Sequence, residues 1–180
     1  MRLFWQHGYE ATSLAMLRDE MGLTQPQIYN AFSDKETLFR LAVERYHANE
    51  LAFAAEALTA PVSTPEAMRR LLIGAAEFYT DPGKPGGCLF FSAALAASPQ
   101  AQPVALELRE RRAANESAIA TRLHQGQLAG DVPPELAASA AAKYISSVMT
   151  GMSLQARDGA STAELCALAE TALLALPIGR

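Results

Sequence analysis

The chain has 180 residues, half of them hydrophobic, and a formal net charge of −4. This is enough apolar material for one buried core, or for a small domain docked on a larger one. The negative charge excludes a general attraction to nucleic acid, so any DNA binding has to come from a local surface. Alanine and leucine dominate while valine and isoleucine are sparse, which favours helices over sheets.

Neither a membrane anchor nor a secretion signal is expected. The longest apolar run, residues 88–97, is far shorter than the roughly 20 residues of a membrane-spanning helix. The first residues lack the apolar core and the small-residue cleavage site of a signal peptide. We therefore expect a cytoplasmic protein whose two cysteines, Cys88 and Cys166, stay reduced.

Breaks rich in glycine and proline divide the chain into segments whose apolar residues lie three and four positions apart. No segment alternates strictly, as a half-buried strand would. The first three segments are short and the later ones longer. The pattern predicts an all-α fold, with a three-helix head at residues 1–46 and a larger C-terminal helical bundle at residues 47–180. The boundary is expected inside the helix that begins near Asp34.

Residues 12–32 carry the sharpest local pattern. The Thr12-Ser13 pair supplies an N-cap for a two-turn helix, and Gly22 follows as a C-cap that can adopt the left-handed conformation. Thr24 then caps a second helix, with Gln27 as its capping-box partner and a proline in the first turn. A helix, a glycine turn and a second helix form a helix-turn-helix, the layout that reads DNA.

The second of these helices is expected to present polar side chains to DNA. If Ile28 and Phe32 face inward, its outer and flanking surfaces carry Gln25, Gln27, Tyr29 and Asn30. Glutamine and asparagine can make paired hydrogen bonds to an adenine edge, and a tyrosine can reach a phosphate. The alternative is a solvated polar helix without a DNA role.

A phosphate contact is also expected at the start of the next helix. Ser33 and Glu36 have the spacing of a capping box, and Lys35 lies in the same first turn. Exposed amides at a helix N-terminus together with a lysine can hold a phosphate.

These residues resemble the signature of the TetR-type, or tetracycline-repressor-like, regulators. The resemblance is carried by Phe4, the run Gly8-Tyr9-Glu10-Ala11-Thr12-Ser13, Gly22-Leu23-Thr24, Ile28-Tyr29, Phe32 and Lys35-Glu36-x-Leu38. It covers about a quarter of the chain. Pro26 in the recognition helix and the segment Gly87-Cys88-Leu89 are similar to one branch of this family.

The resemblance implies nine or so helices, a homodimer and a small-molecule cavity in the C-terminal bundle. It implies a transcriptional repressor that leaves a palindromic operator on double-stranded DNA when an effector alters the spacing of the two heads. Carried over by position, the DNA contacts are Thr12 or Ser13, Gln25, Gln27, Tyr29, Asn30 and Lys35.

Two departures from the family pattern bear on DNA affinity. The first helix is shorter than usual, and the head carries five basic against six acidic side chains. Few phosphate contacts should give a shallow salt dependence. A helical interaction module with a degenerate DNA-binding head is therefore the alternative function.

The last two helices, expected at residues 135–157 and 162–176, are rich in alanine and serine. Small side chains let helices approach closely, so we expect these two to form a four-helix interface with a second copy. The alternative is that they only close the core of their own chain. Their apolar stripes are expected at Leu136, Ala140, Tyr144, Val148 and Met152, and at Leu165, Leu168, Ala172 and Leu176.

An apolar effector pocket is predicted from a cluster of aromatic, sulfur-containing and leucine side chains. Its members are Phe78, Tyr79, Cys88, Leu89, Phe90, Phe91, Met149 and Met152. The alternative for such a cluster is plain core. Arg109, Arg111 and Arg112 could hold an anionic effector, but the interspersed glutamates favour a solvated face.

Cys88 follows two glycines and is expected to open a helix, a position that lowers the pKa of a thiol. A redox sensor or a Cys88-dependent enzyme is therefore an alternative. No histidine lies near it in sequence to act as a base, and the three histidines show no metal-ligand spacing with the cysteines. We expect no enzyme activity, no metal and no cofactor.

Overall fold

The computed structural model describes residues 1–93 and 97–178. Its elements in chain order are α1 (Arg2–Ala11), α2 (Leu14–Met21), α3 (Gln25–Phe32), α4 (Lys35–Glu50), α5 (Ala52–Thr59), α6 (Thr64–Tyr79), α7 (Leu89–Ser92), the short 3-10 helix η1 (Pro99–Ala101), α8 (Gln102–Ala129), α9 (Ala138–Arg157) and α10 (Thr162–Leu174). Within these ranges the chain is helical and contains no strand, which confirms the predicted all-α fold. None of these helices has both the length and the apolar character needed to cross a membrane.

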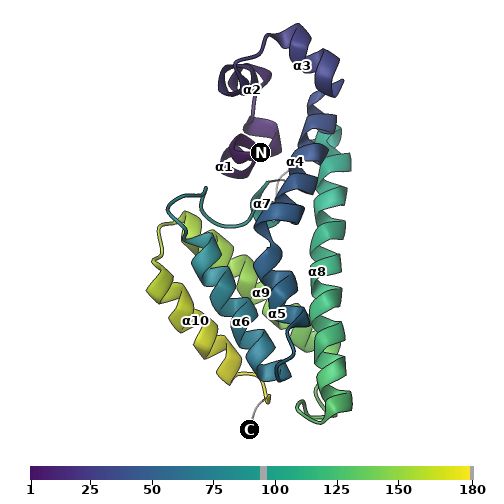
Figure 1. Cartoon of the computed structure of the whole chain (residues 1–180), viewed down its shortest axis with the longest axis vertical. Coiled ribbons are helices and arrows are strands. Elements are labelled where there is room, and N and C mark those ends of the chain that lie inside the picture. The colour runs from purple at the N-terminus through teal and green to yellow at the C-terminus, as the bar shows by residue number, and fades with distance from the viewer. Residues whose placement is uncertain (94–96, 179–180) are drawn as a thin grey trace.

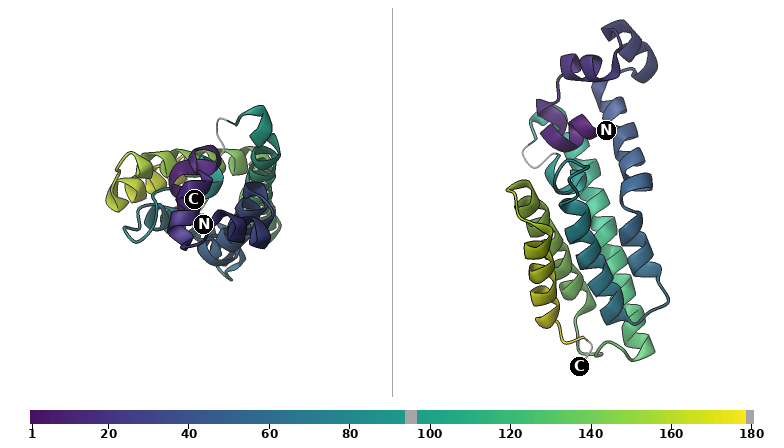
Figure 2. Two further views of the ribbon diagram at one scale, coloured as in Figure 1. Left: turned by 90° about the horizontal axis from the view of Figure 1, so that it is seen from above. Right: turned by 60° about the vertical axis from the view of Figure 1, so that its left-hand side comes forward.

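The molecule is elongated, with α1, α2 and α3 at one end and the bundle at the other (Figure 1). Helix α4 leaves the head and continues down into the bundle beside α8, the longest helix (Figures 1 and 2). Ion pairs join these two helices, one between Arg40 and Glu107 at 3.4 Å and one between Arg111 and Glu44. The head therefore passes into the bundle along a continuous helix.

The apolar periodicity accounts for how most of the bundle packs. In α8, Val104, Leu108, Ile119 and Leu123 are buried. Helix α6 buries one side, which includes Leu71, Leu72, Ala75 and Ala76, and packs between α5, α9 and α10.

The predicted inward stripes of the last two helices were partly wrong. Ala140, Tyr144 and Leu168 are exposed, while Ala141, Ile145, Met149 and Met152 form the buried face of α9. Helix α9 is apolar or small on two sides, so periodicity alone does not say which side faces the core.

Two sets of aromatic rings pack around α1, and the set that contains Trp5 connects the head with the bundle. The Phe4 ring packs edge-on against Phe39 with centroids 5.0 Å apart, and Trp5 contacts Tyr46 at 4.9 Å and Phe78 at 5.5 Å. All of these side chains are buried. The head and the bundle thus share a single hydrophobic core.

Candidate nucleic-acid interface and effector cleft

Helices α2 and α3 form the expected helix-turn-helix. Ser13 caps α2, with its Oγ accepting from the Met16 N–H at 3.1 Å. Gly22 ends the helix in the left-handed conformation at φ 64°. At the start of α3 the Gln27 Oε1 accepts from the backbone N–H of Thr24 at 2.8 Å. Ser13, Gly22 and the Thr24–Gln27 pair therefore have their predicted structural roles.

Helix α3 lies at the tip of the molecule and shows one face to solvent (Figure 1). Ile28 is buried and Phe32 is partly buried, as predicted. Gln25, Tyr29 and Asn30 are exposed, and Tyr29 keeps 41% of its surface accessible. These three side chains project from one short, rigid element, which suits insertion into a major groove.

Gln27 is also exposed, but its amide oxygen is already occupied. The Oε1 accepts from the Thr24 hydroxyl at 2.9 Å as well as from the Thr24 N–H. A paired contact with adenine needs both the oxygen and the nitrogen of the amide. Only the Nε2 of Gln27 remains available while the cap is intact.

Thr12 does not belong to the exposed surface that we predicted. It is completely buried, and its Oγ1 donates to the Gly8 carbonyl at 2.6 Å, closing the end of α1. The sequence offered Thr12 and Ser13 as neighbouring candidates for one cap, and only Ser13 takes that position. Ser13 is exposed, and its hydroxyl proton is still free to donate to a phosphate oxygen.

The expected cap of α4 was wrong by one residue. Asp34, rather than Ser33, is the N-cap, and its Oδ1 accepts from the Thr37 N–H at 2.7 Å. This hydrogen bond holds the pKa of Asp34 below its usual value. Ser33 instead ends α3 at φ 65°, with its N–H donating to the Tyr29 carbonyl. The backbone of Asp34 is extended, which is the geometry that an N-cap requires.

Lys35 is turned toward the protein. Its Nζ donates to the Glu10 carbonyl at 3.3 Å and lies 4.5 Å from the centre of the Tyr9 ring. Partial burial lowers the pKa of this lysine. In this arrangement Lys35 ties the end of α1 to the start of α4, and two of its three N–H donors remain available to a phosphate.

A cleft of about 280 Å³ opens between α5 and α8. Only two of the eight predicted pocket residues, Phe91 and Met149, line it. The remaining lining residues are His47, Leu51, Ala54, Ala55, Leu58, Leu71, Ala114, Asn115, Ala118, Ile119 and Ser146. The cleft exists because both helices carry small alanine side chains where they face each other. A pattern of small residues on α5 and α8 was therefore the sequence signal that could have located it.

The other six predicted pocket residues lie elsewhere. Tyr79, Leu89, Phe90 and Met152 are wholly or almost wholly buried, and Phe78 and Cys88 are also in the core. Phe78 stacks on Trp5, and Phe90 lies 5.2 Å from Tyr46. These aromatic side chains pack the junction of head and bundle, which was the alternative considered for them.

Cys88 does not have the activated thiol that its position suggested. It precedes α7, a helix of four residues, and is buried. Burial raises the pKa of the Cys88 thiol and outweighs the hydrogen bond that its Sγ receives from the Tyr46 hydroxyl at 3.3 Å. Within the described residues, no group of three or more histidine, cysteine, aspartate or glutamate side chains is placed to hold a metal ion.

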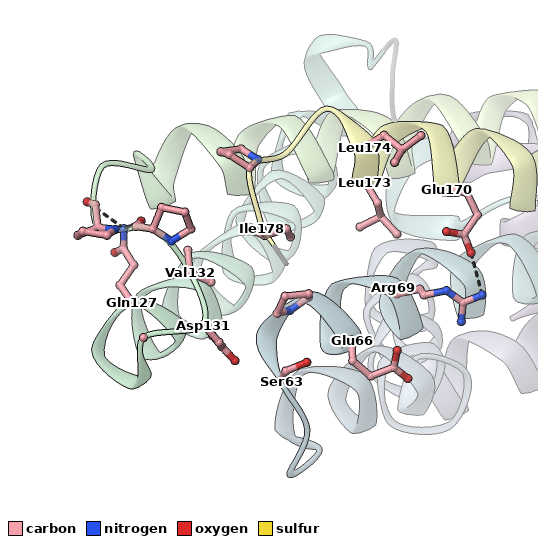
Figure 3. Close-up of a pocket in the computed structure, with 15 residues that line it drawn as sticks. Ser63, Glu66, Arg69, Gln127, Asp131, Val132, Glu170, Leu173, Leu174 and Ile178 are labelled. Carbon is pink, nitrogen blue, oxygen red and sulfur yellow. Dashed lines mark hydrogen bonds and ion pairs between the residues drawn. The ribbon is translucent and has the colours of Figure 1, made fainter. Parts of the chain in front are cut away.

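A wider, more open hollow lies at the far end of the bundle, away from the head (Figure 3). It has a volume of about 990 Å³ and is bounded by the start of α6, the loop after α8 and the end of α10. Arg69 and Glu170 form an ion pair of 2.8 Å on its wall, opposite Asp131 and Val132 (Figure 3). The hollow is larger than the cleft, but it mixes charged and apolar walls, whereas the cleft is mostly apolar.

Helices α9 and α10 expose large apolar side chains. Leu154 keeps 56% of its surface accessible and Leu168 keeps 40%, with Tyr144 and Leu174 also exposed. Small residues such as Ala140 and Gly151 accompany them on the exposed surface. Such a face is typical of a subunit interface.

The fold and the projecting α3 define a helix-turn-helix transcriptional regulator. Residues 1–42 match the family described as bacterial regulatory proteins, tetR family. Residues 65–173 match the tetracyclin repressor-like C-terminal domain. The chain belongs to the TetR family, which confirms the resemblance seen in its sequence.

Similar proteins cover nearly the whole chain. The HTH-type transcriptional repressor ComR of Escherichia coli (strain K12) is 35% identical over 98% of this chain and 85% of its own length. The HTH-type transcriptional repressor BdcR of the same organism is 29% identical over 94% of this chain and 81% of its own length. A solved structure of a cysteine mutant of the TetR family regulator CifR, complexed with 26-base-pair double-strand operator DNA, has a TM-score of 0.95. It is 32% identical, covering 98% of this chain and 92% of that one.

Proposed function

We propose that this regulator is a repressor that binds a palindromic operator as a dimer and is released when a small molecule fills the cleft between α5 and α8. Residues 1–46 would read DNA, and residues 47–180 would bind the effector and pair through α9 and α10. A regulator of chromosomal genes acts in the bacterial cytoplasm. Similarity to the repressors ComR and BdcR supports this function.

The observation that carries the proposal is the exposed face of α3. Gln25 and Asn30 can contact base edges, while Tyr29 and Ser13 can donate to phosphates. All four are carried by helices whose N-terminal caps are already formed, so no helix has to fold on binding and little backbone entropy is lost.

The lining of the cleft defines the class of effector. Among the residues that the structure describes, no lysine, arginine, aspartate or glutamate lines it, and its polar groups are His47, Asn115 and Ser146. Bringing a charged ligand into such surroundings would cost several kcal/mol without a partner charge. Its volume is near the lower end of small-molecule pockets, roughly 300 Å³. We therefore assign the cleft to a small, neutral and mainly apolar molecule with one or two hydrogen-bonding groups.

Cys88 gives no support to a catalytic alternative. Its thiol is buried and its pKa is raised, so little of the nucleophilic thiolate is present near neutral pH. A degenerate head remains the second candidate, because the head is slightly acidic and Lys35 is engaged with Glu10.

Selection of binding sequences from random DNA tests the proposal and separates it from the degenerate head. The wild-type protein should enrich a palindrome, and the enriched sequence should then bind in a fluorescence anisotropy titration. The double variant Tyr29→Ala, Asn30→Ala should lose about 30-fold or more in affinity, because each lost contact is worth about 1–3 kcal/mol. Arg70→Ala, an exposed residue of the bundle, is the control and should bind like wild type. Enrichment of no sequence, or equal binding by the double variant, would refute the proposal.

A matched pair of probes tests the effector class. Benzyl alcohol and benzoate have similar size and shape, but only benzoate carries a charge. The neutral alcohol at millimolar concentration should raise the melting temperature of the protein, since a ligand that binds only the folded state stabilises it. Benzoate should not. A larger shift with benzoate would contradict the assignment.

A further inference from the structure

Helix α1 is docked on the bundle through a kink at Gly8. The residue has φ 82°, and a Cβ there would lie 3.1 Å from the Ala93 carbonyl oxygen. In an uninterrupted helix the Tyr9 N–H would donate to the Trp5 carbonyl. Here it donates to the Ala93 carbonyl at 2.9 Å. The kink thus removes the usual donor of the Trp5 carbonyl.

Arg157, the last residue of α9, supplies donors to the carbonyls of Trp5 and Gln6. Its guanidinium donates to the Trp5 oxygen at 3.2 Å and to the Gln6 oxygen at 2.8 Å. The planar fork of an arginine can serve two neighbouring acceptors at once, which a lysine ammonium cannot do with the same fixed geometry. The end of α9 therefore helps to fix the position of α1, together with the buried Phe4 and Trp5 side chains.

The same end of α9 also contacts the segment between α6 and α7. The Ser153 Oγ, one turn before Arg157, accepts from the Cys88 N–H at 2.8 Å. The Gly87 carbonyl oxygen accepts a hydrogen bond from the indole N–H of Trp5 at 3.2 Å. A Cβ on Gly87 would lie only 2.5 Å from the Ser153 carbonyl oxygen. Helix α1, the segment around Gly87 and the end of α9 thus meet below the head through side-chain-to-backbone hydrogen bonds, and Gly87 packs directly against the backbone of α9.

Helix α9 is in addition a wall of the effector cleft. Met149 lines the cleft, Ser153 lies one turn further and Arg157 one turn beyond that, so all three share one side of the helix. In Figure 1, α9 ends on the side of the bundle that faces α1. A rigid shift of α9 would therefore displace α1 directly through the Arg157 contact, without a movement of α4.

We infer that Arg157 is a positioning residue for the DNA-reading head. It holds α1 in an orientation set by α9, so that cleft occupancy and the α9 interface both control the spacing of the two heads. The inference rests on the proposed function where it concerns DNA. The contact between Arg157 and the head can be tested without DNA.

Trp5 is the only tryptophan of the chain and therefore reports on this junction directly. It is 1% exposed. In Arg157→Ala the acrylamide quenching constant of its fluorescence should rise about two-fold or more as the junction opens locally. Arg69→Ala, which breaks the ion pair with Glu170 at the far end of the bundle, should leave quenching unchanged. An acrylamide quenching constant in Arg157→Ala equal to that of the wild-type protein would overturn the inference.

Operator spacing supplies a readout that loss of stability alone would not change. The sequence selected by the wild-type protein is compared with versions carrying one or two inserted base pairs between the half-sites. Wild type and Arg69→Ala should bind the lengthened DNAs about ten-fold or more weakly than the selected sequence, because heads held at a fixed distance require one separation of the half-sites. Arg157→Ala should bind all three DNAs within about three-fold of one another, and Arg157→Lys should lie between.

A wild-type spacing preference in Arg157→Ala would overturn the inference. If Arg157→Ala shows no unfolding transition in a thermal melt, the spacing preference of Arg157→Lys is used instead. A wild-type spacing preference in Arg157→Lys would then contradict the role of the contact with the two carbonyls. A wild-type protein that enriches no DNA would refute the proposed function, whereas the Trp5 measurement would still decide the role of Arg157.

Discussion

Two glycines with similar positive φ angles allow the close packing below the head to be measured. Gly87 has φ 73° and Gly130 has φ 82°, both in the left-handed region. A Cβ on Gly87 would lie 2.5 Å from the Ser153 carbonyl oxygen and 2.8 Å from its Oγ, whereas nothing lies within 4 Å of a Cβ on Gly130. Replacing each with alanine therefore separates backbone strain from steric overlap.

The expected costs follow from this difference. An alanine in the left-handed region costs about 1–2 kcal/mol, and both variants incur that cost. Gly87→Ala must also displace backbone in a packed region, for which overpacking adds about 1–3 kcal/mol. At roughly 2–4 °C per kcal/mol for a protein of this size, Gly87→Ala should melt about 2–12 °C below Gly130→Ala.

The assay is thermal unfolding followed by circular dichroism, with all proteins at one concentration because a dimer melts in a concentration-dependent way. Gly87→Ala should also bind operator more weakly than Gly130→Ala, since the displaced segment contacts Trp5. Equal melting temperatures for the two variants would refute the view that α9 and residues 86–88 are in tight contact.

Further expectations concern the cleft, the interface, the thiol and the salt response. Ala118→Leu should fill the cleft and abolish the melting shift given by benzyl alcohol, while Ala113→Leu on the exposed side of α8 should keep it. Replacing Leu168 with Glu should give monomers in analytical ultracentrifugation, because the partner would have to bury an unpaired charge; unchanged dimers would place the interface elsewhere. Because burial raises the pKa of Cys88, iodoacetamide at pH 8 should modify it about 100-fold more slowly in the native protein than in urea, as mass spectrometry can show; comparable rates would contradict the burial. The logarithm of the operator-binding constant should fall with the logarithm of the salt concentration with a slope less steep than about −6, because the head offers few cations to phosphates. A steeper slope in binding titrations would point to basic contacts outside the head.

The head could be predicted from sequence because its signals are local. Ser13, Gly22 and Thr24 act within four residues of themselves, through caps and a left-handed turn. The two errors in this region, at Thr12 and Ser33, have the same cause. In each case a neighbouring residue could also cap the helix, and only the path of the backbone decides between them.

The cleft between α5 and α8 was missed because its signal is not local. It exists because Ala114 and Ala118 on α8 face Ala54 and Ala55 on α5, and nothing local shows that these helices face each other. The aromatic residues that suggested a pocket fill the junction of head and bundle instead. Arg157 was not predicted either, because its partners Trp5 and Gln6 lie about 150 residues away.

The ring contacts of Trp5 with Tyr46 and Phe78 limit how this protein can be rebuilt. A fragment of residues 1–46 would leave one side of Trp5 and Tyr46 facing water, so the head is a reading unit without being an independent folding unit. Grafting another regulator's reading helices onto this bundle should succeed only when the exchange stops short of these rings.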